Sequence, residues 1–249
     1  MSNYKIEIQY DGTRYKGWQI LSNNDNTIQG KITEAISKVT GEEVQVIGSG
    51  RTDAGVHAMG QVANFHLTNT KIKDSVSFLN DLNNILPDDI AVISVNKVDG
   101  RFHARFSAVS KTYRYRIHYS KIPNVFERRF VYTYTNTPID VEKMKEAATY
   151  FIGEKDFKSF CNNPKFTKSS VRTITNIDIT KTDSEIIIDY TGDGFLKGMV
   201  RAITGTLIEV ATGQKTASEI PSILESQSRE NAGYTAPACG LCLMEVRYK

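Results

Sequence analysis

The chain has 249 residues, of which 40% are hydrophobic and 24% are charged, a composition ordinary for a globular protein. A chain of this length can form one large domain or two small ones, and in either case it is long enough to bury a hydrophobic core. The formal net charge is only +3, which permits an RNA partner without arguing for one.

The cysteines and the N-terminus indicate where the protein resides. The three cysteines, Cys161, Cys239 and Cys242, cannot all pair within one chain, which favours a reducing compartment. From Met1 the chain runs directly into a strand-like segment without a leader pattern, and no apolar stretch reaches the length of a membrane span. We therefore expect a soluble cytoplasmic protein with no membrane partner.

The first half of the sequence alternates strand and helix patterns. Residues 4–10 alternate polar and apolar side chains as a half-buried strand does. Thr27 is a candidate N-cap for a helix that Gly41 ends. Further along the chain, the patterns predict a strand at 44–47, a strand at 61–66, a helix at 75–85 that ends before Pro87, and a strand at 90–97. The predicted order is βαββαβ.

The second half predicts the same order again. The expected elements are a strand at 111–119, a helix with Val141, Met144, Ala148 and Phe151 on one face, strands at 171–180 and 185–190, a helix from Phe195 to about Val210, and a strand at 241–248. Two such units predict an α+β fold of two ferredoxin-like halves, 1–106 and 107–249. We expect the halves to join into a mainly antiparallel sheet.

One glycine-rich stretch stands out for its chemistry. Residues 48–65 read G-S-G-R-T-D-A-G-V-H-A-M-G-Q-V-A-N-F, with four glycines around Arg51 and Asp53. Glycine permits the close approach of another backbone or a ligand, so the loop is suited to hold these two side chains against a partner. A carboxylate that a nearby guanidinium keeps ionised is a candidate nucleophile or general base. The residues alone leave open a purely structural Arg–Asp pair that ties the loop.

Two later segments carry basic and aromatic side chains. In K-T-Y-R-Y-R-I-H-Y (111–119), strand alternation puts Tyr113 and Tyr115 on one face and Arg114 on the other. In G-F-L-K-G-M-V-R (194–201), Lys197 and Arg201 fall one helical turn apart beside the buried stripe. A tyrosine-rich core face and a solvated basic ridge are the structural alternatives.

The sequence offers little for a metal or a cofactor. Cys239 and Cys242 spell C-x-x-C, but there is no second pair, and residues three apart on a strand point to opposite faces. The histidines, at positions 57, 66, 103 and 118, lack metal-binding spacing, and the Walker lysine is missing after Gly48–Gly50. We expect no metal and no cofactor.

The glycine-rich stretch resembles the signature of the tRNA pseudouridine synthase A family, G-x-G-R-T-D-A-G-V-H-A-x-G-Q-V-A-x-F. The resemblance implies that Asp53 is the catalytic nucleophile and that Arg51 is its neighbouring arginine. F-H-A-R-F-S-A (102–108) with the following strand is similar to the second motif of the family, which makes Tyr113 the active-site tyrosine. G-F-L-K-G-M-V-R is similar to a third motif and implies that Arg201 pairs with the Asp53 carboxylate.

The last strand completes the resemblance. T-A-P-A-C-G-L-C-L (235–243) is similar to the family pattern A-P-x-x-G-L-x-L, which implies that Leu241 and Leu243 pack beside the target base. Lys111 and Arg114 are the basic side chains that we expect to contact the RNA. The chain departs from the family at Leu21, at Lys197–Gly198 and at Ala238, and these departures concern the RNA contacts rather than the reaction.

The family resemblance implies a function and a partner. The expected activity is the isomerisation of uridine to pseudouridine at positions 38, 39 and 40 of the tRNA anticodon stem-loop, in a central cleft between the halves of a homodimeric enzyme. Two alternatives stay open at this stage. One is a non-catalytic tRNA-binding protein or chaperone of the same fold, and the other is an aspartate-dependent glycosidase or nucleosidase, which would need a second carboxylate as acid.

Overall fold

The computed structural model describes residues 1–22, 26–136, 138–163, 165 and 167–249, which form two compact units. The first unit comprises Met1–Val109 with Leu243–Lys249, and the second comprises Ser110–Cys242. The last strand of the chain thus contributes residues to both units. The assignment of domains to 1–106 and 107–249 stays a prediction.

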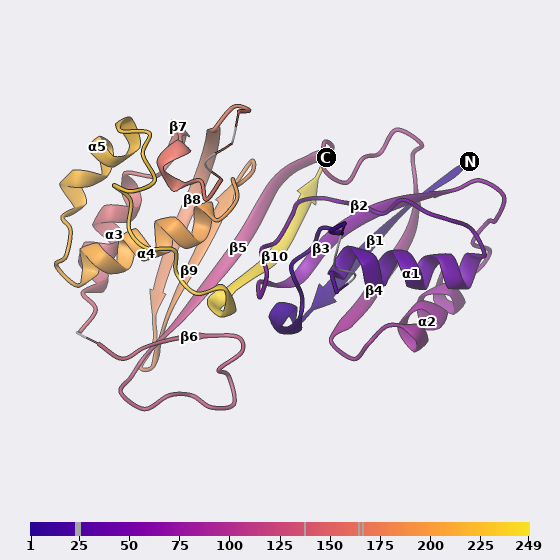
Figure 1. Cartoon of the computed structure of the whole chain (residues 1–249), viewed down its shortest axis with the longest axis horizontal. Helices are drawn as coiled ribbons and strands as arrows, with labels where there is room; N and C mark the ends of the chain where they lie inside the picture. Colours follow the sequence, from indigo (N-terminus) through magenta and orange to yellow (C-terminus); the bar gives the residue numbers. More distant parts are fainter. Residues whose placement is uncertain (23–25, 137, 164, 166) are drawn as a thin grey trace. The chain divides into compact units, whose positions relative to one another are not determined.

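The first unit follows the predicted order of elements (Figure 1). They are β1 (Ser2–Tyr10), α1 (Ile28–Thr40), β2 (Ile47–Gly48), β3 (His57–Leu67), α2 (Ser75–Ile85) and β4 (Ile90–Val98), with β10 (Leu241–Tyr248) at the end of the chain. The strand order is β4-β1-β3-β10, and β2 pairs with β3. Because β1 is antiparallel to both β3 and β4, its two edges are fully paired.

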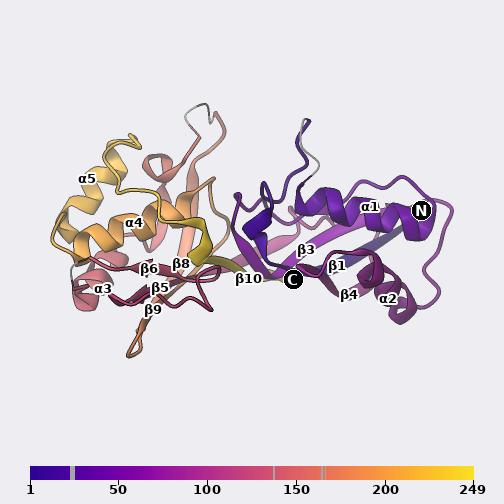
Figure 2. The ribbon, with the colours of Figure 1, turned by 60° about the horizontal axis from the view of Figure 1, so that its bottom comes forward.

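The core of the first unit lies between this sheet and its helices. Tyr4 of β1 pairs with Phe65 of β3, and their rings stack with a centroid distance of 5.7 Å. Phe65 in turn stacks on Phe78 of α2, and α1 lies over β1 and β3 (Figure 2). The alternation of buried and half-buried residues along β1 confirms the pattern in the sequence.

Capping residues place both helices of the first unit where the sequence predicts them. The Thr27 hydroxyl accepts a hydrogen bond from the Gly30 N–H at 3.2 Å, and Gly41 ends α1 in the left-handed conformation. Asp74 caps α2 in the same manner, and that helix ends two residues before Pro87. These local signals act without help from distant residues, which explains why the helix bounds were predictable.

The second unit repeats the strand and helix order with three additions. Its elements are β5 (Ala108–Tyr119), β6 (Tyr132–Tyr134), α3 (Val141–Thr149), β7 (Gly153–Asp156), β8 (Val171–Lys181), β9 (Glu185–Gly192), α4 (Met199–Ala211) and α5 (Ile220–Glu225). The strand order is β5-β9-β8-β7, and β6 pairs in parallel with β5. Short 3-10 helices lie at Gly12–Arg14, Lys158–Phe160, Ala217–Glu219 and Ala238–Gly240 of the whole chain. The described residues form ten strands, mostly antiparallel, and with the helices they confirm the predicted α+β class.

The core of the second unit is aromatic. Tyr113 and Tyr115 of β5 and Tyr190 of β9 are buried on one face of the sheet. The hydroxyl of Tyr190 lies 2.8 Å from that of Thr204 on α4, so this helix covers the same face. Burial raises the pKa of Tyr190, which keeps its phenol neutral. In Figure 1, α3 and α5 gather near α4 beside these strands.

Several expectations about element bounds were wrong. The strand expected at 44–47 is only Ile47–Gly48, because the Val46 carbonyl accepts a hydrogen bond from the Gln29 side chain at 2.7 Å instead of joining a ladder. The helix expected from Phe195 begins at Met199, because Gly198 is left-handed with φ +70°. Lys197 therefore precedes α4 rather than lying one turn from Arg201. The short elements β6, β7 and α5 were not predicted.

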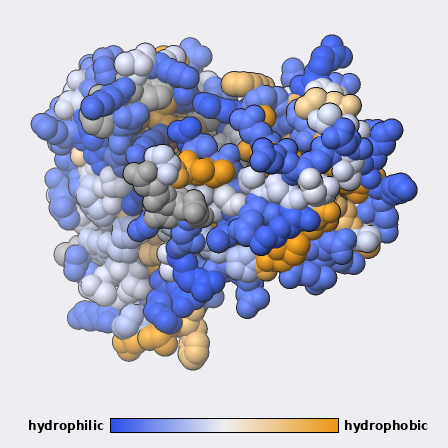
Figure 3. All heavy atoms as spheres, turned by 45° about the vertical axis from the view of Figure 1, so that its right-hand side comes forward, coloured by the Kyte–Doolittle hydropathy of each residue, from blue (hydrophilic) through white to orange (hydrophobic). Residues whose placement is uncertain are grey.

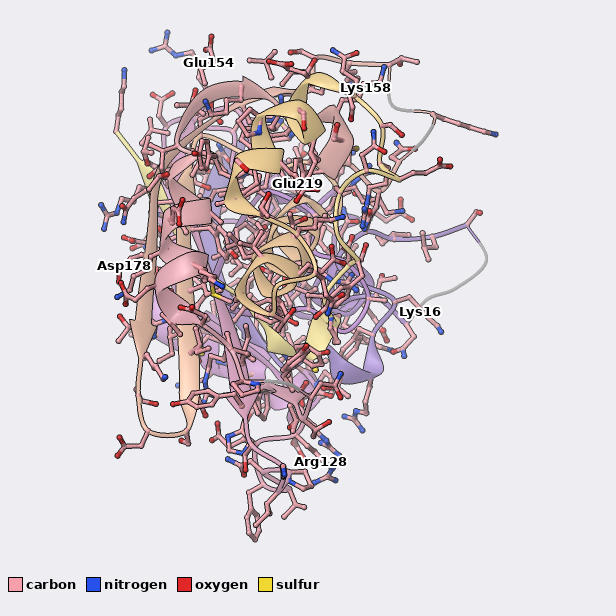
Figure 4. The ribbon with its side chains drawn as sticks, turned by 90° about the vertical axis from the view of Figure 1, so that its left-hand side faces the viewer. Lys16, Arg128, Glu154, Lys158, Asp178 and Glu219 are labelled. Carbon is pink, nitrogen blue, oxygen red and sulfur yellow. The ribbon has the colours of Figure 1, made fainter. Side chains whose placement is uncertain are left out.

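The loop between β5 and β6 is the most exposed apolar part of the second unit. Ile122 is 77% exposed and Phe126 is 93% exposed. Hydrophobic side chains form the lowest part of the surface in Figure 3, and Arg128 marks the same loop in Figure 4. Among the described residues, no helix combines the length and the apolar character that crossing a bilayer requires.

A hydrogen-bonded carboxylate just after α1, that of Glu42, makes folding depend on pH. The Thr70 hydroxyl, followed by the Thr68 and Thr70 N–H groups that donate to the Glu42 carboxylate, lowers the pKa of Glu42 to about 2 from the ordinary 4.5. A depressed carboxyl pKa stabilises the folded state above the unfolded pKa, and this contribution disappears as the pH falls through the folded one. We predict that Glu42→Gln lowers the Tm at pH 7, and that the gap from wild type closes between about pH 4.5 and about pH 2.

Thermal unfolding followed by circular dichroism across this pH range measures the gap. Glu43→Gln is the control, because Glu43 is the adjacent carboxylate and is exposed. A gap of constant size at all pH values would contradict the assigned role of Glu42.

Candidate active site

The loop that carries Asp53 joins β2 to β3 and is fixed at its base by Gln61. The Ser49 hydroxyl donates to Gln61 Oε1 at 2.7 Å, and Gln61 Nε2 donates to the Gly50 carbonyl at 3.1 Å. The Ser49 N–H also reaches the Val62 carbonyl at 2.7 Å. Gln61 is fully buried, so these bonds have no competition from water. One strand residue thus holds the first turn of the loop.

The segment that follows β1 supports the loop from the other side. The Trp18 N–H donates to the Thr52 carbonyl at 3.1 Å, and the Tyr10 hydroxyl lies 2.9 Å from that of Thr52. A Cβ atom at Gly12 would lie 2.0 Å from the Val56 carbonyl oxygen, so only glycine allows this approach. Residues 10–18 and 50–56 therefore form one rigid backbone assembly.

His57 holds the same assembly together. The Gly12 N–H donates to His57 Nδ1 at 3.1 Å. Asp11 Oδ1 lies 3.2 Å from the same nitrogen. Asp11 also accepts a hydrogen bond from the Thr13 N–H. The position of His57 agrees with a supporting role.

Arg51 and Asp53 flank the buried Thr52 on this loop. Asp53 is half-buried, and its carbonyl accepts a hydrogen bond from the Val56 N–H at 3.2 Å, which closes a tight turn. Arg51 is exposed, and its Nε donates to Gln19 Oε1 at 3.0 Å. Gln19 is held in turn by Gln29 of α1 at 2.7 Å. The described loop thus orients the guanidinium through neutral amides.

In the second unit, Tyr113 and its neighbours lie on β5. The Tyr113 ring is 7% exposed and meets Phe195 edge to face at a centroid distance of 5.3 Å. On the opposite face of the strand, Arg114 binds Asp189 through two hydrogen bonds of 2.8 and 2.7 Å. This ion pair leaves Arg114 less available to RNA than the sequence suggested. Lys111, at the start of the paired region, is half-buried and lies opposite Gly192.

Arg201 lies in the first turn of α4. Its Nε donates to the Ala236 carbonyl at 2.7 Å, and the Ala236 N–H donates to the Arg201 carbonyl at 3.0 Å. Both the side chain and the backbone of Arg201 are therefore bound to one residue of the segment before β10. The guanidinium is half-buried.

The strand β10 carries the remaining candidates. Leu241 and Leu243 are buried, Leu241 in the second unit and Leu243 in the first. Cys239 and Cys242 are free thiols, and the Cys239 thiol donates to the Val131 carbonyl. Among the described residues, no group of three or more His, Cys, Asp or Glu side chains is arranged to hold a metal ion.

The sequence matches the tRNA pseudouridine synthase family over residues 6–107 and 147–249. The chain belongs to this family. It is 48% identical to tRNA pseudouridine synthase A of Acetivibrio thermocellus over 249 residues, with both chains covered completely. It is 45% identical to tRNA pseudouridine synthase A 2 of Bacillus cereus and 43% identical to tRNA pseudouridine synthase A of Brevibacillus brevis, each with complete coverage. Family membership makes the protein an isomerase.

A comparison of structures gives only a distant likeness. A chain of the crystal structure of a Cbf5–Nop10–Gar1 complex aligns with a TM-score of 0.41 and 10% identity, covering 96% of this chain and 48% of the other. This score is too low to assign a fold.

The sequence did not single out every residue that fixes the candidate site. Gln61 lies within the glycine-rich stretch that was recognised, but its role as a loop support, like that of Gln19, depends on partners ten or more positions away. Asn162 and Arg229, which contact the segment before β10, lie outside all the motifs. No local pattern in the sequence identifies such residues.

The close approach at Gly12 generates a test. We predict that Gly12→Ala lowers the free energy of unfolding by about 1–3 kcal/mol, because the new methyl group would collide with the backbone at Val56. Chemical denaturation measures the change. Gly100→Ala is the control, since a Cβ there meets nothing within 4 Å, and it should stay within about 0.5 kcal/mol of wild type. Equal effects of the two substitutions would contradict the assembly described above.

Proposed function

We propose that this enzyme isomerises uridine to pseudouridine at positions 38, 39 and 40 of the tRNA anticodon stem-loop, with Asp53 as the nucleophile. The observation that carries the proposal is the rigid loop that presents Asp53 and Arg51 in a chain matching tRNA pseudouridine synthases along its whole length. A nucleophile on an immobile backbone loses little entropy when substrate binds.

The reaction determines what the side chains must do. The bond between ribose C1′ and uracil N1 breaks, the base turns, and a new bond joins C1′ to C5. N1 gains a proton and C5 loses one, so the substrate and product are isomers and no group donor is consumed. Asp53 would attack either ribose C1′ or uracil C6. In both routes, a positioned carboxylate forms a covalent intermediate that later collapses.

The other candidates have roles that suit their chemistry. Arg201 would pair with the Asp53 carboxylate and keep it ionised, because a guanidinium is always charged and can bind a carboxylate with two hydrogen bonds. Tyr113 would stack on the uracil and help to move the proton at C5. Arg51 would contact the substrate beside Asp53.

The substrate must enter the site as an extruded nucleotide. A base inside a stem is not accessible to a nucleophile, so the target uridine would flip out of its stack. Leu241 and Leu243 would pack beside the flipped base, and Lys111 and Arg114 would contact the RNA backbone.

The decisive experiment uses tRNA transcripts with tritium at uridine C5. Formation of the new bond at C5 releases this tritium to water. We predict that wild type releases tritium at positions 38, 39 and 40 and that Asp53→Asn releases none, while both bind tRNA with similar affinity. Asp81→Asn is the matched control, because it makes the same chemical change at an exposed position of α2 and should retain full activity.

Other outcomes would favour the alternatives. Binding by wild type without tritium release would indicate a non-catalytic tRNA-binding protein. Release of free uracil would indicate a nucleosidase. Full activity of Asp53→Asn would exclude Asp53 as the nucleophile.

We also propose that the enzyme works as a cytoplasmic homodimer. The support is the family resemblance, together with free thiols at all three cysteines, which suit a reducing compartment. We predict a mass close to twice the 27.9 kDa of one chain in sedimentation velocity at micromolar concentration. A single species at the mass of one chain, with or without tRNA, would contradict the dimer.

A further inference from the structure

The segment from Ala232 to Pro237, here called the strap, runs along helix α4. The Gly233 N–H donates to the Thr206 hydroxyl at 2.8 Å, and the Ala236 N–H donates to the Arg201 carbonyl at 3.0 Å. A Cβ atom at Gly205 would lie 1.8 Å from the Tyr234 carbonyl oxygen, so the strap touches the helix backbone. The position of the strap is therefore fixed relative to the first turns of α4.

The end of the strap holds the side chain of Arg201. Its Nε bonds to the Ala236 carbonyl at 2.7 Å, and Ala236 is fully buried. Because the guanidinium group is planar, a hydrogen bond at Nε fixes the orientation of the whole group. A shift of the strap by a fraction of an ångström would therefore move the two terminal nitrogens of Arg201.

Arg229 anchors the strap from the other side. Its Nη1 donates to the Gly233 carbonyl at 2.8 Å, and its Nη2 donates to the Thr235 hydroxyl at 2.7 Å. Its Nε donates to Asn162 Oδ1 at 2.7 Å. These acceptors, and the Ala232 carbonyl at 3.4 Å from Nη1, are all neutral oxygens, so these bonds make the guanidinium a geometric brace.

Asn162 connects this brace to the start of α4. Its N–H donates to the Lys197 carbonyl at 2.8 Å, and its Nδ2 donates to the Thr235 hydroxyl at 3.0 Å. A Cβ atom at Gly198 would lie 2.2 Å from Nδ2, so the glycine provides the space that the amide occupies. The Lys197–Gly198 pair, a departure from the family pattern, thus admits Asn162 into the network.

We propose that Arg229 is a positioning residue for Arg201. Through Thr235 and Asn162 it fixes the strap, and Ala236 then orients the Arg201 guanidinium for the reaction. This inference rests on the proposed function, in which Arg201 acts at the catalytic site.

The test is a double-mutant cycle read by the single-turnover rate of tritium release from tRNA saturated with enzyme. Arg229→Ala should lower this rate about tenfold to a hundredfold, because a small misplacement of a catalytic group has effects of this size. The affinity for tRNA should change little. In an Arg201→Ala background, Arg229→Ala should cause no further loss, since the group that it orients is absent.

Chemical rescue separates positioning from general stability. Added methylguanidinium should restore part of the rate of Arg229→Ala and none of the rate of the double variant. Thr235→Val is a second variant, for use if Arg229→Ala folds poorly. It removes one acceptor of Arg229 while keeping the side-chain shape, and it should also lower the rate. Arg116→Ala is the control, because it removes a half-buried arginine that is paired with Glu185. This substitution should lower the Tm without lowering the rate of tritium release.

Each result has one meaning for the proposal. A wild-type rate in both Arg229→Ala and Thr235→Val would overturn the proposal. It would also be overturned if the double variant lost rate by the full product of the effects of Arg229→Ala and Arg201→Ala. If Arg201→Ala itself keeps the wild-type rate, the role of Arg201 in the proposed function fails, which is a different outcome from failure of the brace alone.

Discussion

The loop that presents Asp53 has no regular secondary structure, so its buried backbone groups need hydrogen-bond partners from elsewhere in the first unit. The segment after β1 and the side chain of Gln61 supply these partners. An unpaired buried carbonyl costs about 1–3 kcal/mol, which makes these bonds a condition for the loop to exist in one conformation. The same requirement explains why Trp18 and Thr52, far apart in sequence, are both buried at this place.

The second unit also contains an irregular segment whose buried polar groups need hydrogen-bond partners. The strap before β10 is irregular, and its N–H and carbonyl groups bond to side chains and backbone of α4 and to Arg229. In both units, an irregular segment becomes rigid because side-chain and backbone groups from elsewhere in the same unit satisfy its polar groups. Each of these segments then determines the position of one charged group, Asp53 in the first unit and Arg201 in the second.

The sequence predicted the regular elements well because their signals are local. The caps at Thr27 and Asp74 and the alternation along β1 each involve only a few neighbouring residues. The bounds of β2 and α4 were wrong because they depend on a contact from Gln29 and on the left-handed Gly198. The candidate site shows the same division. The motifs led to Asp53 and Arg201, whereas the contact between Asn162 and Arg229 joins residues 67 positions apart, which no local pattern encodes.

The arginines of this chain fall into two groups by the charge of their partners. Arg114 and Arg116 on β5 bind carboxylates, and these ion pairs raise the pKa of each guanidinium. The bond that orients Arg51 ends instead on an amide oxygen, so this bond does not neutralise the guanidinium. With a net charge of only +3, the protein has little long-range attraction for RNA to offer. Binding of an anionic substrate then benefits from a guanidinium whose restraint leaves its charge intact, which is the property that distinguishes Arg51 from the arginines of β5.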